Sequence, residues 1–237
     1  MIPAPKPAES DYKLKDITKM NGSLAQRVYE VLRDAILALD LPPGALLKKQ
    51  VICEQLSVSR SPVTEAITRL AGEGLVEVVP QSGSRVTKFS LPEIREGAFL
   101  REAVELAAVA KVAEERTDDQ LAQLKRNLRL QAMCLEEGDE IGFYREDEHM
   151  HELILEFTGF PKLGALAATG WIQVNRARQL LLPLSERAVG AFQEHLAIIA
   201  AIETKNPPAA REAMRQHLSE LVTRLEPLAQ ERPDLFD

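Results

Sequence analysis

The chain has 237 residues, which is enough for two modest domains that each bury a core. It carries 29 Lys and Arg against 36 Asp and Glu, a net charge of −7. No run of about eighteen apolar residues occurs, so we expect no membrane span. Cys53 and Cys134 are isolated and form no CxxC pattern, which fits a cytoplasmic protein without a disulfide framework.

The charge is divided unevenly along the chain. Residues 1–90 hold 12 Lys and Arg against 10 Asp and Glu, whereas residues 91–237 hold 17 against 26. The acidity therefore belongs to the C-terminal part. A small local surface in the N-terminal part can still supply contacts to phosphate, so the net charge does not exclude DNA binding.

The first twenty residues contain three prolines among scattered charges, and no apolar segment follows the start. This pattern predicts a disordered arm over residues 1–20 rather than a signal peptide. Ser23 and Gln26 then form a capping-box pattern, and an apolar stripe at helical spacing follows. A first helix is predicted to end at the Pro- and Gly-containing turn at 40–44.

A second helix is predicted near Lys49 to Leu56, followed by a short polar turn. A third helix follows, with Ser61 as its N-cap and Pro62 as its first residue. Two β-rich runs around a Gly-bearing turn then predict a hairpin. We therefore expect a winged helix-turn-helix over residues 21–89.

Residues 90–92 are the expected linker, and everything after them has helical periodicity. Breaks at Pro, Gly and acidic residues predict six helices, at 93–115, 118–136, 139–157, 161–182, 186–204 and 207–226. The expected fold is mostly α, with an all-α bundle over residues 93–228 following the winged helix-turn-helix. The last residues, 233–237, are expected to be a frayed end.

One carboxylate and three imidazoles form a candidate metal site in this bundle. Asp147 and His151 are four residues apart on one helix, so their side chains leave the same face. His195 and His217 lie in two later helical segments among apolar residues. Such a set suits one divalent transition metal, and Zn, Ni, Mn and Fe all remain open. The alternative is that each histidine is a solvated or hydrogen-bonded helix residue. His149 points to another face and is not expected to be a ligand.

Residues 58–86, "VSRSPVTEAITRLAGEGLVEVVPQSGSRV", and the preceding residues 28–47 closely resemble the winged helix-turn-helix of GntR-family regulators. The resemblance implies a recognition helix whose first residues enter the major groove, with Arg60 reaching a guanine or a phosphate. The alternative is that Arg60 is only a solvated turn residue. The DNA-contact candidates are Gln50, Ser59, Arg60, Ser61, Thr64 and Gly83. Members of the family often carry arginine where this chain has Thr64, and sometimes where it has Gln50.

The C-terminal part resembles the FCD effector domain of FadR-like GntR regulators. Four segments carry the resemblance: "LREAVELAA" (100–108), "DEHMHELI" (147–154), "QEHLAII" (193–199) and "RQHLSEL" (215–221). The resemblance implies that Asp147, His151, His195 and His217 bind a metal ion. Six helices rather than seven would place the domain in the VanR-like branch.

Three residues are candidates for binding an effector. Arg101 matches an arginine that the family turns toward an anionic effector, and a guanidinium pairs well with a carboxylate. A salt bridge with Glu102 or Glu105 is the alternative role. Asn175 and Arg178 share a helix face with Trp171 by spacing and are candidates for the same cavity, with core or surface positions as the alternative.

These patterns together predict a cytoplasmic, homodimeric transcriptional regulator that responds to a small carboxylate, with repression as the default. A two-fold dimer would read a pseudo-palindromic double-stranded operator, because one recognition helix reads only a short half-site. The rival is a helical metalloenzyme whose Asp/His₃ site activates water. That rival leaves the winged helix-turn-helix without a role. A second rival is a structural metal without an effector.

Overall fold

The computed structural model describes residues 12–79, 83–181 and 185–237, without the side chains at 168, 169, 185 and 186. The chain divides into two compact units. One comprises the described residues up to Leu91 together with Ala229–Asp237, and the other is Pro92–Leu228. Among the described helices, none has the length and apolar character that crossing a membrane requires.

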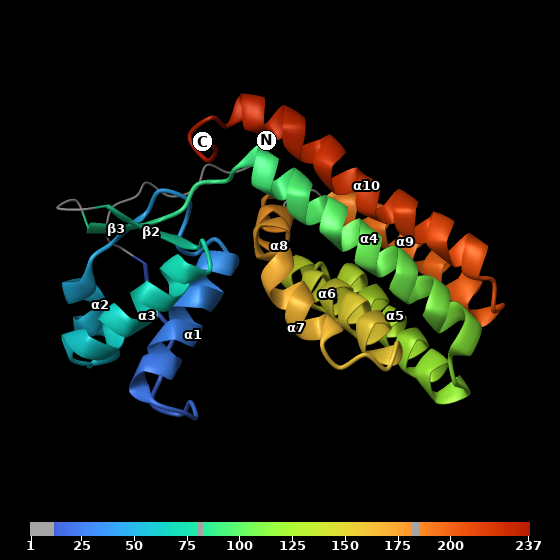
Figure 1. Cartoon of the computed structure of the whole chain (residues 1–237), viewed down its shortest axis with the longest axis horizontal. Helices are drawn as coiled ribbons and strands as arrows, with labels where there is room; N and C mark the ends of the chain where they lie inside the picture. The colour runs from blue at the N-terminus through green and yellow to red at the C-terminus, as the bar shows by residue number, and fades with distance from the viewer. Residues whose placement is uncertain (1–11, 80–82, 182–184) are drawn as a thin grey trace. The chain divides into compact units, whose positions relative to one another are not determined.

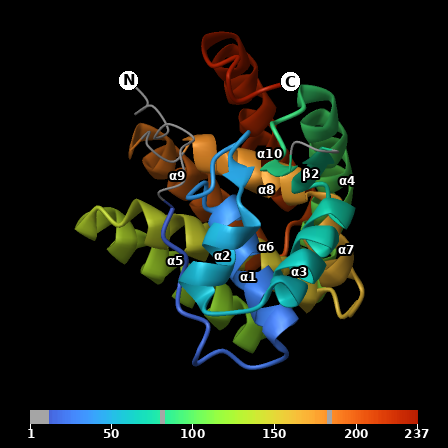
Figure 2. The same cartoon turned by 90° about the vertical axis from the view of Figure 1, so that its left-hand side faces the viewer.

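Three helices form the body of the first unit: α1 (Leu24–Leu37), α2 (Lys49–Leu56) and α3 (Arg60–Gly72). Ser23 caps α1, because its side-chain oxygen accepts a hydrogen bond from Gln26 N at 3.2 Å. The Gln26 side chain donates to Glu30 instead of completing the expected capping box. The apolar face of α1 packs on α3, and Figure 2 shows these helices facing the viewer.

A three-stranded antiparallel sheet completes this unit. The hairpin strands β2 (Val76–Val79) and β3 (Gly83–Val86) pair with Val76 opposite Val86 and Val79 opposite Gly83. A two-residue strand, β1 (Leu46–Leu47), pairs with the other edge of β3 and was too short to be predicted. The turn residues 80–82 of the expected wing lie outside the described residues.

The predicted disordered arm is wrong for residues 12–20, whereas residues 1–11 lie outside the described part. Leu14 and Ile17 are buried. Leu14 N donates to the Gln55 side chain at 3.0 Å, and Gln55 donates to the Tyr12 carbonyl at 2.8 Å. The polar, proline-containing start masked these two apolar residues, whose burial holds the segment against the first unit.

The predicted frayed C-terminus is also wrong. The segment after the last helix pairs with the stretch that follows β3, through a parallel bridge between Phe89 and Phe236. Phe89 N donates to the Leu235 carbonyl and Asp237 N donates to the Phe89 carbonyl, both at 2.9 Å. The two phenylalanine rings are 5.5 Å apart, and Leu235 is buried beside them. The apolar pair therefore anchors the chain end within the first unit.

The second unit is a bundle of seven α-helices among the described residues, not six. They are α4 (Leu91–Glu115), α5 (Asp118–Glu137), α6 (Glu140–Phe157), α7 (Leu163–Gly170), α8 (Ile172–Arg178), α9 (Ser185–Glu203) and α10 (Pro207–Glu231). The predicted helix 161–182 is interrupted at Trp171, whose φ of −128° and ψ of 28° are not helical, and ends in a short 3₁₀ turn, Gln179–Leu181. The six-helix count that would favour the VanR-like branch is thus not met.

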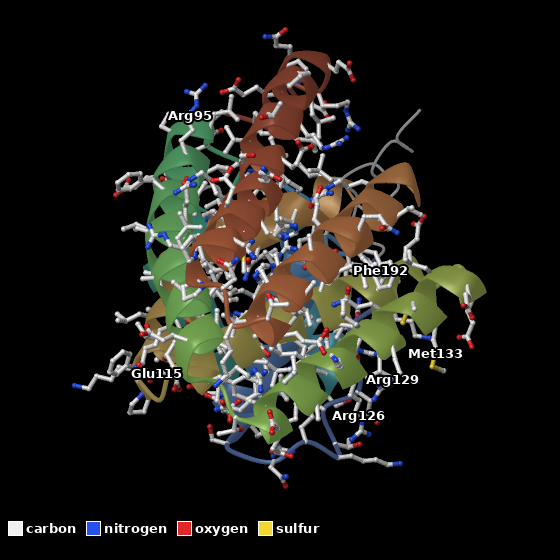
Figure 3. The ribbon with its side chains drawn as sticks, turned by 90° about the vertical axis from the view of Figure 1, so that its right-hand side faces the viewer. Arg95, Glu115, Arg126, Arg129, Met133 and Phe192 are labelled. Atoms are coloured by element: carbon white, nitrogen blue, oxygen red, sulfur yellow. The ribbon has the colours of Figure 1, made fainter. Side chains whose placement is uncertain are left out.

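The bundle buries one large apolar cluster to which α4, α5, α6, α9 and α10 all contribute. Figure 1 shows α4 beside α10, and Figure 3 shows α9 on the other side of α10. The helix α5 packs on α6 and α9. Helix α10 continues through Pro227, five residues beyond its predicted end at 226. These helices surround the buried polar residues described next.

Candidate metal centre and ligand cavity

Three helices bring the predicted metal ligands together. Asp147 and His151 lie one turn apart on α6, His195 lies on α9 and His217 on α10, and all four are buried. One ligand atom from each lies within 4.8 Å of the others. Atoms bound to one ion at about 2.0–2.2 Å are at most about 4.4 Å apart, so the cluster is close to the size of a coordination shell.

Each histidine directs Nδ1 away from the cluster and toward an acceptor. His151 Nδ1 contacts Glu105, His195 Nδ1 lies 2.7 Å from Gln131 Oε1, and His217 Nδ1 lies 2.7 Å from Glu194 Oε2. These acceptors assign the ring proton to Nδ1, because a carboxylate or amide oxygen only accepts. Each Nε2 is therefore unprotonated, and its lone pair faces the middle of the cluster, as in histidines that bind metal ions in proteins.

The atoms facing the centre are short of hydrogen-bond donors. His151 Nε2 and His217 Nε2 face each other at 3.1 Å. His195 Nε2 is 3.1 Å from Asp147 Oδ1 and has no hydrogen-bond partner among the described residues. Buried lone pairs beside a carboxylate need a cation or a proton between them. The donor set thus fits a divalent transition metal.

The charge states of Asp147, His151 and His217 are also those of metal ligands. Burial holds the pKa of His217 well below its usual range, and burial lowers the pKa of His151 although Glu105 opposes it. Burial alone would raise the pKa of Asp147, but the Arg178 guanidinium and the neighbouring histidines together outweigh it and keep that pKa well below its usual range. Neutral imidazoles and an ionised carboxylate are the forms that bind metal.

His149 lies apart from the cluster, as its position on α6 predicts. Its side chain is 50% exposed, and Nδ1 is 3.5 Å from Glu152. An exposed imidazole paired with a surface carboxylate has no access to the buried centre.

A cavity of about 80 Å³ opens beside the cluster. About 10–15 Å³ of such volume takes one water molecule, so the cavity has room for several small polar groups. Two of the metal-ligand candidates, Asp147 and His217, form part of its wall. The other described lining residues are Ala98, Arg101, Phe143, Tyr144, Val174, Arg178, Leu181, Arg187, Ala188, Ala191, Leu218 and Leu221.

Two of the three effector candidates line this cavity. Arg101 is buried and also bonds Glu105, so its alternative role as a salt-bridge partner is present as well. Arg178 lines the cavity and forms an ion pair with Asp147. Asn175 is not among the described lining residues, because its side chain donates to Glu148 at 3.0 Å.

Sequence reasoning missed several polar residues around the centre. Arg187 lines the cavity, and Glu194 and Gln131 hold two of the histidines. Glu105 entered only as a possible salt-bridge partner. The four-residue spacing of Arg101 and Glu105 was a usable signal. Contacts such as His195 to Gln131 join distant helices and leave no local pattern.

The DNA-contact candidates lie at the exposed end of α3 and near it. The cap of α3 differs from the prediction: Ser59 is the N-cap, and Arg60 rather than Pro62 is the first helical residue. Arg60 therefore belongs to the first turn of the helix. All six candidates are exposed: Gln50, Ser59, Arg60, Ser61, Thr64 and Gly83. Gly83 begins β3 with a φ of +96°, which suits glycine.

A winged helix-turn-helix unit joined to a helical unit with a buried ligand cluster defines a DNA-binding transcriptional regulator. The pattern "Bacterial regulatory proteins, gntR family" matches residues 24–86, and the pattern "FCD domain" matches residues 96–220. The chain belongs to the GntR family of transcriptional regulators and has the FadR-like architecture with an FCD domain.

Proteins that are similar over nearly the whole chain support this family membership. The HTH-type transcriptional repressor RspR of Escherichia coli (strain K12) is 31% identical over 215 residues, covering 89% of this chain and 92% of that protein. An uncharacterized HTH-type transcriptional regulator of Streptomyces ambofaciens is 32% identical over 224 residues and 93% of each chain. The solved structure of E. coli McbR/YncC has the same fold, with a TM-score of 0.76 at 23% identity over 88% of this chain and 99% of that one.

The metalloenzyme alternative is therefore set aside, because the family and its relatives are transcriptional regulators.

Proposed function

We propose that this protein is a cytoplasmic, homodimeric repressor whose FCD domain binds a divalent metal ion and a small carboxylate that changes operator affinity. One observation carries the proposal: three Nε2 lone pairs and the Asp147 carboxylate converge beside a cavity lined by arginines. Repression is inferred from relatives named as transcriptional repressors, among them RspR.

The metal ion would be held by Asp147, His151, His195 and His217. Zn, Ni, Mn and Fe all suit this nitrogen and oxygen set. When bound, the ion supplies a Lewis-acidic point that attracts an anionic ligand. The residues around the cluster hold the imidazoles in the metal-binding tautomer.

A small carboxylate suits the cavity by charge and by size. Arg101, Arg178 and Arg187 line it, and guanidinium groups bind carboxylates through paired hydrogen bonds. Arg101 and Arg187 are each partly neutralised by a glutamate, and Arg178 by Asp147. A metal ion that draws on the charge of these acids leaves the cavity more positive and thus selective for an anion.

DNA binding is assigned to the exposed start of α3 with neighbouring groups. Arg60, Ser59 and Ser61 surround the helix N-terminus, whose free amides attract phosphate. Thr64 lies one turn further along α3, Gln50 lies on α2 and Gly83 lies at the wing.

The test of metal and acid binding is a thermal-shift series on the full chain. Protein stripped with chelator is reloaded with Zn, Ni or Mn, and its metal content is measured. We expect about one ion per chain and a raised melting temperature, since a ligand of the native state stabilises it by mass action. His195→Ala should lose the ion, whereas His149→Ala, on the exposed face, should keep it.

Organic and sugar acids are then screened on the loaded protein. A stabilising carboxylate should need the metal and should lose its effect in Arg101→Ala. Arg95→Ala is the matched control, because Arg95 lies on the outside of α4 near its start (Figure 3) and pairs with Glu226 at 2.6 Å. Absence of bound metal after incubation with all three ions would refute the site. If only neutral or cationic compounds stabilise the protein, the proposal that the ligand is a carboxylate is refuted.

A further inference from the structure

A buried carboxylate joins one of the metal-ligand histidines to the wall of the cavity. Glu105 on α4 is 1% exposed, with Oε1 lying 2.5 Å from Arg101 Nε and Oε2 accepting from His151 Nδ1. Arg101 lines the cavity and has further N–H donors beyond the one that Glu105 uses. Arg101, Glu105 and His151 thus form a continuous chain from the cavity to the cluster.

A second chain of the same composition reaches another histidine. Glu194 on α9 accepts from His217 Nδ1 at 2.7 Å. The same carboxylate accepts two hydrogen bonds from Arg187, both at 2.9 Å. Arg187 also lines the cavity. Two arginine–glutamate–histidine chains, built from different helices, therefore connect the cavity to the cluster.

The third histidine is held differently. His195 Nδ1 lies 2.7 Å from Gln131 Oε1, and Gln131 donates to Asn127 Oδ1 at 2.7 Å. Asn127 in turn donates to the Glu146 carbonyl at 2.9 Å. Gln131 and Asn127 are neutral amides and are not among the described residues of the cavity wall. This arm positions a ligand without a charged link to the cavity.

We propose that Glu105 and Glu194 are positioning residues that couple two binding events, so that the metal ion and an anion in the cavity each raise the affinity for the other. The inference rests on the proposed metal and acid binding and concerns how the two are linked. The Gln131 arm would hold His195 but would carry none of this coupling.

The coupling follows from sharing one carboxylate between two donors. A cation at Nε2 draws electron density from the imidazole, so Nδ1–H becomes a stronger donor and takes more of the glutamate charge. The arginine on the other side of the glutamate is then less neutralised and binds an anion more strongly. An anion on the arginine acts in reverse and strengthens the histidine as a ligand. Such coupling is reciprocal by thermodynamic necessity.

The test measures Zn²⁺ affinity of the full chain by competition with a chelating dye. Each titration is made with chloride alone and with a mixture of acetate, succinate and gluconate at equal ionic strength. The variants are Glu105→Gln and Glu194→Gln, with Gln131→Ala as the matched control. In the wild type, the acids should raise Zn²⁺ affinity by about 5-fold or more, which is the lower end of ordinary coupling.

Each glutamate variant should bind Zn²⁺ about 10- to 100-fold more weakly, as expected for an outer partner of a histidine ligand. Each should also lose much of the enhancement by acids. Gln131→Ala should weaken Zn²⁺ binding but keep the enhancement. Coupling is overturned if the acids leave wild-type Zn²⁺ affinity unchanged, if both glutamate variants keep the enhancement, or if Gln131→Ala loses it equally. A wild type that binds no Zn²⁺, Ni²⁺ or Mn²⁺ would instead refute the metal site itself.

Glu105→Gln leaves the Arg101 charge buried without its carboxylate, which can destabilise the fold. The double variant Arg101→Gln/Glu105→Gln removes that charge and keeps the test informative. It should fold and bind Zn²⁺, and acids should raise its Zn²⁺ affinity less than in the wild type. Glu194 is partly exposed, so Glu194→Gln avoids this difficulty.

Discussion

At the scale of single residues, the chemistry of the centre depends on which ring nitrogen of each histidine is protonated. Glu105, Gln131 and Glu194 each accept a hydrogen bond from the Nδ1–H of one histidine. The consequence is a centre lined by lone pairs and one carboxylate. The same burial that suits a metal ion makes protonation of His151 and His217 unfavourable in its absence.

This predicts a pH dependence of stability for the metal-free protein. The pKa values of His151 and His217 are lowered in the fold, so below about pH 6.5 the unfolded chain binds protons that the folded chain does not. The contribution of these histidines to the free energy of unfolding should therefore be at its maximum above about pH 6.5. It should fall on acidification, by at most about 1.4 kcal/mol per pH unit for each imidazole. Asp147, whose pKa is also lowered, should add to the loss below about pH 4.

Urea unfolding with chelator at pH 7.5, 6.5 and 5.5 measures this slope. The slope reports how many more protons the unfolded chain binds than the folded chain, and His217→Gln should reduce that number by about one. His149→Gln is the control substitution, because that side chain is half exposed and lies apart from the cluster. An unfolding free energy that is level from pH 7.5 to 5.5 in the wild type would contradict the neutral buried histidines.

At the scale of elements, the residue at which α3 begins decides which side chains of the winged helix-turn-helix can contact DNA. The helix α3 begins at Arg60, so this guanidinium stands in the first turn beside the free backbone amides. A charged group at a helix start that enters the major groove can pair with guanine O6 and N7. The later start predicted from Pro62 would have left Arg60 in the preceding turn.

Arg60→Ala should weaken specific binding by about 1–3 kcal/mol if Arg60 pairs with a guanine. A duplex selected by the wild type from a random pool serves as the operator, titrated at fixed salt. The melting temperature should hardly change, because Arg60 is exposed. Arg126→Ala, an exposed arginine on α5 (Figure 3), should bind as the wild type does. Equal affinities for both variants would remove Arg60 from the contact surface.

At the scale of the whole molecule, the bundle has an exposed apolar face along α4 and α7. Phe99 is 70% exposed and Leu166 is 64% exposed. The two segments run close together at both ends. A Cβ added at Gly97 would be 3.6 Å from the Gly170 carbonyl, and Lys111 Nζ is 5.5 Å from the Phe160 ring. The second copy of the chain in the proposed homodimer is expected to cover this face, because reading a two-fold operator needs two copies.

Phe99→Glu and Leu166→Glu should each shift the protein from dimer toward monomer in sedimentation experiments, since a charge would be buried without a partner in the interface. Ile141→Glu is the control, because Ile141 is 77% exposed and lies at the start of α6, on a different helix from Phe99 and Leu166. A dimer as stable in Phe99→Glu and Leu166→Glu as in the control would place the interface elsewhere.

The sequence by itself determined the winged helix-turn-helix, the helical character of the C-terminal part and the four residues of the buried cluster. Apolar spacing and turn residues are local signals, and Asp147 and His151 share a helix face wherever that helix packs. Only the tertiary structure decided that the three histidines are held by Glu105, Gln131 and Glu194, and that Asn175 faces Glu148. The break at Trp171 and the anchoring of Phe236 on Phe89 likewise depend on packing between segments far apart in the chain, where local propensity carries no information.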